Sequence, residues 1–288
     1  MLRRIDRVQL AVPDADMAAK GWISLLGAEE AGWDKVQGLG ARRLRLRLGV
    51  GVIEFLVPDG AGRIAEAVAK RGAHLYAAGA STPDIEGLSQ HLREKDVEPL
   101  AEAGQLHLDE KETGISGLRV VISPDEVLPP VGDIDFLYEA TLLSGETEAV
   151  TRKLNDLFGL DERNYCEITS TNFGYRGTLT LFEKNELHRF EVIQPTVEGT
   201  TMHRYFSKFG QGLYMAFAET TKINLIQQRA QDAGAGFTLD RPEERSADLP
   251  SDQLWLHPKS LGGMMLGLSR PSMAWSWSGR PERVETID

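Results

Sequence analysis

Hydrophobic and polar residues alternate near the start of the chain in the pattern of a half-buried strand. Residues 5–12 show this alternation, and the segment 13–16 that follows supplies a turn and a helix N-cap. We expect a helix over 17–26 that ends at Gly27, since glycine readily adopts the left-handed conformation of a helix C-terminus. Residues 42–57 then predict two strands around a glycine-rich turn. The start of the chain therefore predicts a β-α-β-β-β unit.

The same pattern recurs three more times along the chain. In the second copy, strands at 72–78 and 117–124 enclose a helix at 84–95. The third and fourth copies begin with strands near Glu139 and Gly212. In the third copy we expect a helix at 147–158 and paired strands at 178–182 and 188–193. In the fourth copy we expect a helix at 222–233 and a closing strand at 263–271.

Prolines and acidic residues between the second and third copies predict a linker. The three prolines in 124–133 lack a backbone donor, so a sheet ladder cannot continue through this segment. We therefore expect an α+β protein of four βαβββ modules, with two modules in each domain. The expected parts are an N-terminal domain at 1–125, a linker at 126–133, a C-terminal domain at 134–271 and a C-terminal tail at 272–288.

Several short segments, in their order and spacing, resemble the vicinal oxygen chelate superfamily. These segments are 5–14 with 25–27, 52–56, 72–74, 157–159, 190–192 and 257–263. The superfamily includes glyoxalase I, methylmalonyl-CoA epimerase, bleomycin-resistance proteins and extradiol ring-cleaving dioxygenases. The resemblance covers residues 4–271. It implies two tandem glyoxalase-like domains, in each of which two modules close into a cup that can hold a divalent metal ion.

Charge and cysteine content exclude several classes of function. The chain carries 43 Asp and Glu residues against 32 Lys and Arg, a net charge of −11, which argues against nucleic acid or an anionic membrane as a partner. Its single cysteine, Cys166, rules out an internal disulfide and a cysteine-based metal site. No apolar run approaches the about 18 residues of a membrane helix. We expect a cytoplasmic protein that binds a small molecule, either as a monomer or as a homodimer.

The resemblance implies metal-ligand positions in the first and last strands of each module. In the N-terminal domain these positions fall on Arg7, Glu54, His74 and a valine, Val120 or Val121. Imidazole nitrogen and carboxylate oxygen suit a divalent metal, so Glu54 and His74 are candidate metal ligands. The set is incomplete, because neither arginine nor valine coordinates a metal.

Two alternatives stay open for the N-terminal cup. Beside Glu54, Arg7 could form a bidentate ion pair and take the place of the cation. Gln9, two residues further, lies on the same strand face as Arg7. A register shifted by one pair would make Gln9, Glu54 and His74 three metal ligands. Arg7 and Gln9 are also candidates for binding substrate.

In the C-terminal domain the implied positions fall on Glu139, Glu191, Tyr214 and Gly267. A different register would put Phe136 at the first of them and weaken the site further. The ring-cleaving dioxygenases of the superfamily need two histidines and one glutamate in this half. Iron-dependent ring cleavage is therefore the less favoured function.

Two carboxylates and a phenol in one cavity are suited to acid/base chemistry without a metal. Two nearby carboxylates cannot both ionise cheaply in a low dielectric, so one of Glu139 and Glu191 is expected to keep its proton. Tyr214 could then polarise a carbonyl group. The alternative is that Glu139 is solvated and that Glu191 pairs with a neighbour such as Arg189 or Lys184.

Two classes of function follow. The first is a glyoxalase/epimerase-like lyase or isomerase that acts on a small oxo- or hydroxy-acid, a thioester or an aromatic catabolite, with Trp255 and His257 as further substrate contacts. The second is a metal-free protein that sequesters a small molecule in an aromatic cup. The candidate aromatic residues are Tyr76, Phe173, Tyr175, Phe217 and Trp255.

Two further features are expected at the surface. The arginines at 42, 43, 45 and 47 alternate with leucines and predict a strand with one solvated face. His188 falls on the strand face opposite Glu191, so we expect it to be exposed.

Overall fold

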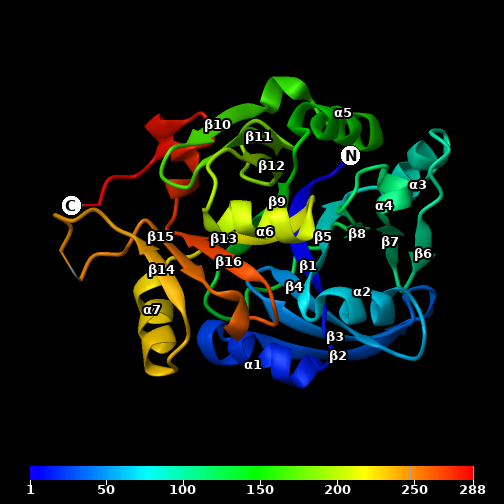
Figure 1. Cartoon of the computed structure of the whole chain (residues 1–288), viewed down its shortest axis with the longest axis horizontal. Helices are drawn as coiled ribbons and strands as arrows, with labels where there is room; N and C mark the ends of the chain where they lie inside the picture. Colours follow the sequence, from blue (N-terminus) through cyan, green and yellow to red (C-terminus); the bar gives the residue numbers. More distant parts are fainter. Residues whose placement is uncertain (247, 288) are drawn as a thin grey trace.

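The computed structural model describes residues 1–246 and 248–287, and its N-terminal half forms one sheet of eight strands (Figure 1). The strand order is β2-β3-β4-β1-β5-β8-β7-β6, so the two modules of this half pair through β1 and β5. The elements in chain order are β1 (Arg4–Ala11), α1 (Ala15–Leu26), β2 (Glu29–Val36), η1 (Gln37–Leu39), β3 (Ala41–Leu48), β4 (Gly51–Pro58), α2 (Arg63–Arg71), β5 (His74–Thr82), α3 (Ile85–Arg93), β6 (Leu100–Glu102), β7 (Gln105–Leu108), α4 (Glu110–Thr113) and β8 (Val120–Pro124).

The C-terminal half forms a second sheet of eight strands with the same topology. The strand order is β10-β11-β12-β9-β13-β16-β15-β14, and its modules pair through β9 and β13. The elements in chain order are β9 (Phe136–Leu143), α5 (Thr147–Phe158), η2 (Glu162–Asn164), β10 (Cys166–Ser170), β11 (Tyr175–Leu181), β12 (Arg189–Pro195), α6 (Thr201–Phe209), β13 (Gly212–Glu219), α7 (Ile223–Asp232), β14 (Phe237–Asp240), β15 (Gln253–Leu256), η3 (Pro258–Ser260), β16 (Met265–Ser269), η4 (Met273–Ser276) and η5 (Pro281–Arg283).

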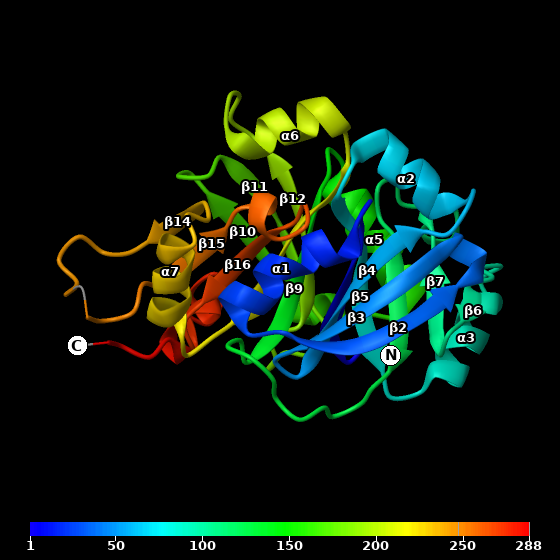
Figure 2. The same ribbon diagram turned by 90° about the horizontal axis from the view of Figure 1, so that it is seen from below.

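The predicted α+β class and the four βαβββ modules are confirmed. The local signals act as expected: the Asp14 side chain accepts the Met17 N–H at 2.9 Å to start α1, and Gly27 ends this helix with φ of 71°. Two helices that the pattern did not predict, α2 and α6, join the two modules within each half. They lie next to each other on one side of the molecule (Figure 2).

Each sheet curls into an open half-barrel, called here the N-terminal cup and the C-terminal cup (Figure 1). Side chains inside the N-terminal cup form one small hydrophobic cluster, and those inside the C-terminal cup form another that is rich in aromatic residues. The largest cluster lies between the outer faces of the sheets and helices α1, α3, α5 and α7. No helix among the described residues is long and apolar enough to span a membrane.

The two halves are packed firmly against each other. Residues from both contribute to the largest hydrophobic cluster, and β1 contacts β9 directly. Residues 126–133 form no strand, although Val131 makes an isolated antiparallel bridge with Gly49. Because the two sheets share a core, the domain boundaries at 125 and 134 stay a prediction.

Helix α1 approaches the C-terminal half at Gly21. A Cβ atom at this position would lie 1.7 Å from the carbonyl oxygen of Ser260 in η3. This close backbone approach allows no side chain, since the neighbouring atom is itself part of the backbone.

We therefore expect Gly21→Ala to destabilise the protein. Overpacking costs about 1–3 kcal/mol, whereas the better helix propensity of alanine returns about 0.5–1 kcal/mol. The expected net loss is about 1–2 kcal/mol in the free energy of unfolding, measured by denaturant titration. Ser24→Ala, on the exposed side of the same helix, is the control and should change stability by less than about 0.5 kcal/mol. A stabilised Gly21→Ala protein would contradict the packing described here.

Candidate functional site

The N-terminal cup is organised around the fully buried Glu54 on β4. Its Oε1 accepts hydrogen bonds from Arg7 Nη1 at 3.1 Å and from Gln105 Nε2 at 2.8 Å. Its Oε2 accepts from Gln9 Nε2 at 2.7 Å, and Arg43 Nη1 lies 3.4 Å from both oxygens. Burial opposes ionisation, but the guanidinium groups of Arg7 and Arg43 outweigh it and hold the pKa of Glu54 below its ordinary value. Glu54 is thus a satisfied carboxylate.

Arg7 lies beside Glu54, as the alternative in which an arginine takes the place of the metal ion requires. Its bidentate ion pair, however, is with Asp6. Arg7 Nε and Nη2 donate to the two carboxylate oxygens of Asp6 at 3.2 and 2.9 Å, and only Nη1 reaches Glu54. The stem of Arg7 crosses β5 at Gly79, where a Cβ atom would lie 1.9 Å from Arg7 Cγ. The missing side chain of Gly79 therefore makes room for the arginine inside the cup.

Gln9 and Glu54 are brought together, but His74 is not. Gln9 pairs with Glu54 in the β1–β4 register, whereas an irregularity in the β1–β5 register just beyond Gln9 places His74 opposite Ala11. The Nδ1 atom of His74 bonds to the carbonyl oxygen of Gly72 at 2.8 Å, and none of the hydrogen bonds of Glu54 involves His74. Burial lowers the pKa of His74 to about 4, aided by nearby arginines.

Arg43 was expected on a solvated strand face, and this expectation was wrong. Its side chain is 2% exposed and lies inside the cup, because the sheet curls β3 inward toward β4. Arg43 donates to both oxygens of Asp34, at 2.9 and 2.6 Å, and also to Gln105. With Ile64 of α2 packed into the same cup, the N-terminal cup is filled by its own side chains.

The C-terminal cup contains a pair of buried glutamates, Glu139 on β9 and Glu191 on β12, which are 1% and 5% exposed. The hydroxyl group of Thr141 lies between them and donates to Glu191 Oε2 at 2.6 Å, with Glu139 Oε1 3.4 Å away. Arg189 Nε donates to Glu139 Oε2 at 2.7 Å. Arginine at 189 therefore pairs with Glu139, rather than with Glu191.

This arrangement makes the two glutamates unequal. Burial raises the pKa of Glu191 well above its ordinary value, and the charge of Glu139 raises it further. The ion pair with the fully buried Arg189 places the negative charge on Glu139. These contacts favour the proton on Glu191.

The charges of Glu139 and Glu191 affect the pKa of Tyr175, whereas they do not act on Tyr214. Burial raises the pKa of Tyr175, and the charges of Glu191 and Glu139 add to the effect. Tyr214 packs instead against Tyr205 of α6, with ring centroids 5.0 Å apart. Burial raises the pKa of Tyr214 to about 12. The reason for the difference is a register irregularity between residues 213 and 215 of β13, which turns Tyr214 toward α6.

Aromatic side chains form the opposite wall of the C-terminal cup. Trp255 lies in this wall, with ring centroids 5.4 Å from Phe173 and 6.3 Å from Phe217. His257 lies at the rim, where its Nε2 is 2.9 Å from the hydroxyl oxygen of Thr238. Trp255 thus faces the cup, while His257 is bound to a neighbouring strand end.

Neither cup fits the metal ion that the resemblance implies. Among residues 1–246 and 248–287, no three or more His, Cys, Asp or Glu side chains form a group that could hold a metal. In the N-terminal cup, two arginines occupy the surroundings of Glu54. In the C-terminal cup, the ring of Phe217 covers Gly267, and a Cβ atom at Gly267 would lie 2.2 Å from this ring. The two carboxylates there do not match the two-histidine, one-carboxylate set of non-haem iron sites.

Helix α6 closes the C-terminal cup, since Met202, Tyr205 and Phe206 pack against its aromatic cluster. Arg71, at the end of α2, holds this helix from the other half of the molecule. Its guanidinium group donates to the Tyr205 hydroxyl and lies 5.5 Å from the centroid of the Tyr205 ring. It also lies 4.8 Å from the ring centroid of Phe209. Arg71 thus joins the two halves at the mouth of the cup.

Sequence reasoning missed Thr141 and helix α6, and it named Tyr175 only as an aromatic residue of a binding cup. Thr141 could have been found, because it lies two residues after Glu139 and so on the same strand face. Tyr175 lies in a strand whose start the pattern did not define, and α6 depends on packing against the cup.

No family model matches the sequence, and no curated protein matches it. Among solved structures, a mutant form of 4-hydroxymandelate synthase from Streptomyces coelicolor is similar over 99% of this chain and 100% of that chain, with 13% identity and a TM-score of 0.68. A xylose isomerase-like TIM barrel/4-hydroxyphenylpyruvate dioxygenase fusion protein is similar over 94% of this chain and 49% of that chain, with 12% identity and a TM-score of 0.64. Methylmalonyl-CoA epimerase from Mycobacterium tuberculosis aligns with 48% of this chain and 89% of that chain, at 16% identity and a TM-score of 0.39.

These two similarities, over 99% and 94% of this chain, confirm the expected fold. The chain is a tandem protein with two glyoxalase-like domains. At 12 and 13% identity the similarity shows the fold alone, so the activity has to be argued from the side chains in the cups.

Glu54→Gln is expected to lower the free energy of unfolding by about 1–3 kcal/mol at pH 7, because it removes the buried negative charge that Arg7 and Arg43 share, although Arg7 keeps Asp6 and Arg43 keeps Asp34 as partners. The pKa of Glu54 is lowered in the folded state, so its contribution is complete above the unfolded-state pKa of about 4.3 and is lost as the pH falls through the folded-state value. Stability is measured by denaturant titration at several pH values. Glu86→Gln, an exposed position on α3, is the control, and an equal effect of both changes would refute the role of Glu54.

Arg71→Ala is expected to loosen helix α6. Loss of a hydrogen bond and of cation–π contacts amounts to about 1–2 kcal/mol, or roughly tenfold faster amide hydrogen exchange in residues 201–209. Mass spectrometry after deuterium labelling measures this rate. Lys70→Ala, at an exposed neighbouring position, should leave it unchanged.

Proposed function

We propose that the C-terminal cup catalyses acid/base proton transfer, as a lyase or isomerase does on a carbon next to a carbonyl group. The observation that carries the proposal is the buried Glu139/Glu191 pair, in which Arg189 binds only one member. A pair with one charge and one proton supplies a base and an acid at the same pH.

The reaction would use the two glutamates in sequence. The carboxylate of Glu139 takes the proton from the carbon next to the carbonyl group, and the carboxyl group of Glu191 gives its proton to the carbonyl oxygen. An enol results, and no electrons leave the substrate. After Glu139 exchanges its proton with solvent, return of a proton to the carbon and of the enol proton to Glu191 completes the cycle, and the net outcome is exchange of the substrate C–H with a solvent proton. Inversion requires that the returning proton reach the opposite face of the enol.

The other residues of the cup would position the substrate. Thr141 fixes the Glu191 carboxyl group by its 2.6 Å hydrogen bond. Tyr175 keeps its proton and can donate it in a hydrogen bond to the substrate oxygen. Arg189 Nη2 is buried and has no hydrogen-bond partner among the described residues, so it offers a donor to an anionic substrate group. With Trp255 and Phe217 as an apolar wall, these groups favour a small oxo- or hydroxy-acid, a thioester or an aromatic catabolite.

A dioxygenase function is less favoured, although one similar structure carries that word in its name. Non-haem iron sites of the two-histidine type need imidazole ligands, and the implied positions in this cup hold Glu139, Tyr214 and Gly267. The donor set thus supports proton transfer better than oxygen chemistry.

A second candidate is a binding protein that sequesters a small aromatic molecule. The contacts among Phe173, Phe217 and Trp255 favour it, since stacked aromatic walls bind planar molecules without any chemistry. This candidate predicts ligand binding that does not depend on the proton of Glu191.

Deuterium exchange separates the two candidates. The protein is incubated in D2O with a 2-oxo acid, a 2-hydroxy acid and an acyl thioester, and loss of the C–H signal is followed by proton NMR. Wild type should catalyse exchange in one of these classes, and Glu191→Gln should reduce the rate by a factor of about 10² to 10⁴. The rate should also fall as the pH rises through the raised pKa of Glu191, because the acid form is lost.

The matched control is Glu183→Gln, an exposed glutamate in the turn before β12, which should retain the wild-type rate. Exchange that persists unchanged in Glu191→Gln would refute the catalytic assignment. Binding of a probe without exchange by wild type would favour the sequestering protein.

A further inference from the structure

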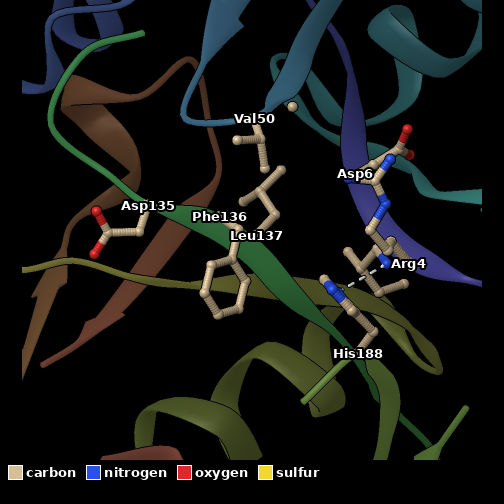
Figure 3. Close-up of a pocket in the computed structure, with 9 residues that line it drawn as sticks. Arg4, Asp6, Val50, Asp135, Phe136, Leu137 and His188 are labelled. Carbon is tan, nitrogen blue, oxygen red and sulfur yellow. Dashed lines mark hydrogen bonds between the residues drawn. The ribbon is translucent and has the colours of Figure 1, made fainter. Parts of the chain in front are cut away.

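A pocket of about 240 Å³ lies where the two halves of the molecule meet (Figure 3). Its walls come from the first residues of β1 and β9, from the β3–β4 turn and from the residue before β12. The lining residues are Arg4, Ile5, Asp6, Val50, Gly51, Asp135, Phe136, Leu137 and His188. Both halves are needed to form it, and most of its surface is apolar.

His188 provides a buried donor in this pocket. We expected this side chain at the surface, but it is only 9% exposed, because β1 packs over it. Its Nδ1 accepts the backbone N–H of Ile5 at 3.2 Å (Figure 3). The ring is neutral, since burial and the nearby arginines lower its pKa to about 3, and the single ring proton is therefore on Nε2. Nε2 has no protein partner within the described part of the chain.

Three arginines lie near the end of the pocket that contains His188, and each has an ion-pair partner: Glu186 for Arg3, Asp125 for Arg4 and Glu139 for Arg189. Arg4 lines the pocket, and Arg3 and Arg189 contribute to the potential at the imidazole ring, with Asp125 as the opposing charge. An N–H donor such as Nε2 forms a hydrogen bond to an anionic acceptor that is about twice as strong as one to a neutral acceptor, so this donor favours an anion.

The two lining carboxylates do not cancel this preference. Asp6 gives both of its oxygens to Arg7, so its charge is compensated. Asp135 lies at the far end of the pocket from His188, where its Oδ2 accepts the Thr221 N–H at 3.0 Å (Figure 3). A ligand whose anionic group lies beside His188 would accept a hydrogen bond from Nε2. The apolar part of this ligand would lie along the middle of the pocket.

The walls fit a planar apolar body. The rings of Phe136 and His188 are inclined to each other with centroids 5.7 Å apart, and Ile5, Val50 and Leu137 complete the surface. The volume is below the about 300–1,000 Å³ of sites for drug-sized ligands, so the occupant is smaller than those.

We propose that this pocket is a second small-molecule site, which binds a small aromatic monocarboxylate with its carboxylate on His188 Nε2 and its ring against Phe136. The site contacts both β1 and β9, so its occupant would bind to the joined halves and stabilise their arrangement. Neither Glu139 nor Glu191 lines this pocket, so its occupancy can be tested separately from the reaction proposed for the C-terminal cup.

Benzoate is the probe for this site, with benzamide as its uncharged analogue of the same shape. Saturation-transfer NMR and calorimetric titration of the full chain should show benzoate binding, and benzamide should bind at least about tenfold more weakly. Equal binding of the two compounds would overturn the anionic specificity. No benzoate binding at millimolar concentration would overturn the proposal.

Two variants locate the bound ligand. Val50→Trp fills the pocket from the partly exposed turn, and it should abolish benzoate binding. His188→Asn keeps an acceptor for the Ile5 N–H but removes the donor at the Nε2 position, and should weaken binding at least about tenfold. His91→Asn, on α3, is the matched control and should bind as wild type does.

Retained binding in Val50→Trp would place the ligand elsewhere and overturn the proposal, even if His188→Asn failed to fold. Benzoate binding in Glu191→Gln should equal that of wild type. This last measurement separates failure of the pocket from failure of the proposed reaction.

Discussion

Burying a carboxyl group away from water is the constraint on which both cups depend, since an isolated buried charge is far too costly to persist. Each half of the chain places a glutamate on the strand next to its first strand, Glu54 in one and Glu191 in the other. Arginines beside Glu54 hold its pKa below the ordinary value, whereas burial and the neighbouring Glu139 raise the pKa of Glu191. One cup is thereby a structural ionic network, and the other retains groups that can exchange a proton.

The difference between the cups follows from single positions in equivalent strands. In the N-terminal cup, the small Gly79 lets Arg7 lie flat across the sheet and reach Glu54. In the C-terminal cup, Gly267 is covered by the ring of Phe217, which makes the wall aromatic. The same topology therefore supports a polar network in one half and an aromatic cluster in the other, as expected when function depends on the site and not on the fold.

Much of the fold could be predicted, because strand alternation and helix caps are local signals. The Asp14 and Gly27 caps, for example, need no distant contact. Strand alternation predicted only which residues face the same cup. Thr141 joins Glu139 and Glu191 as such a pair, and Gln9 donates to Glu54. Register irregularities in β5 and β13 separate His74 and Tyr214 from these groups, and nothing in the sequence marks where such irregularities occur.

The sequence by itself determined the four modules and which residues of a strand share a face, since periodicity is a property of neighbouring residues. Only the tertiary structure decided the partner of each charge. The curl of the sheet brought Arg43 inside, and the packing of the two halves buried His188. Pairing of this kind depends on distances between residues far apart in the chain, and these distances exist only after the sheets have closed and docked.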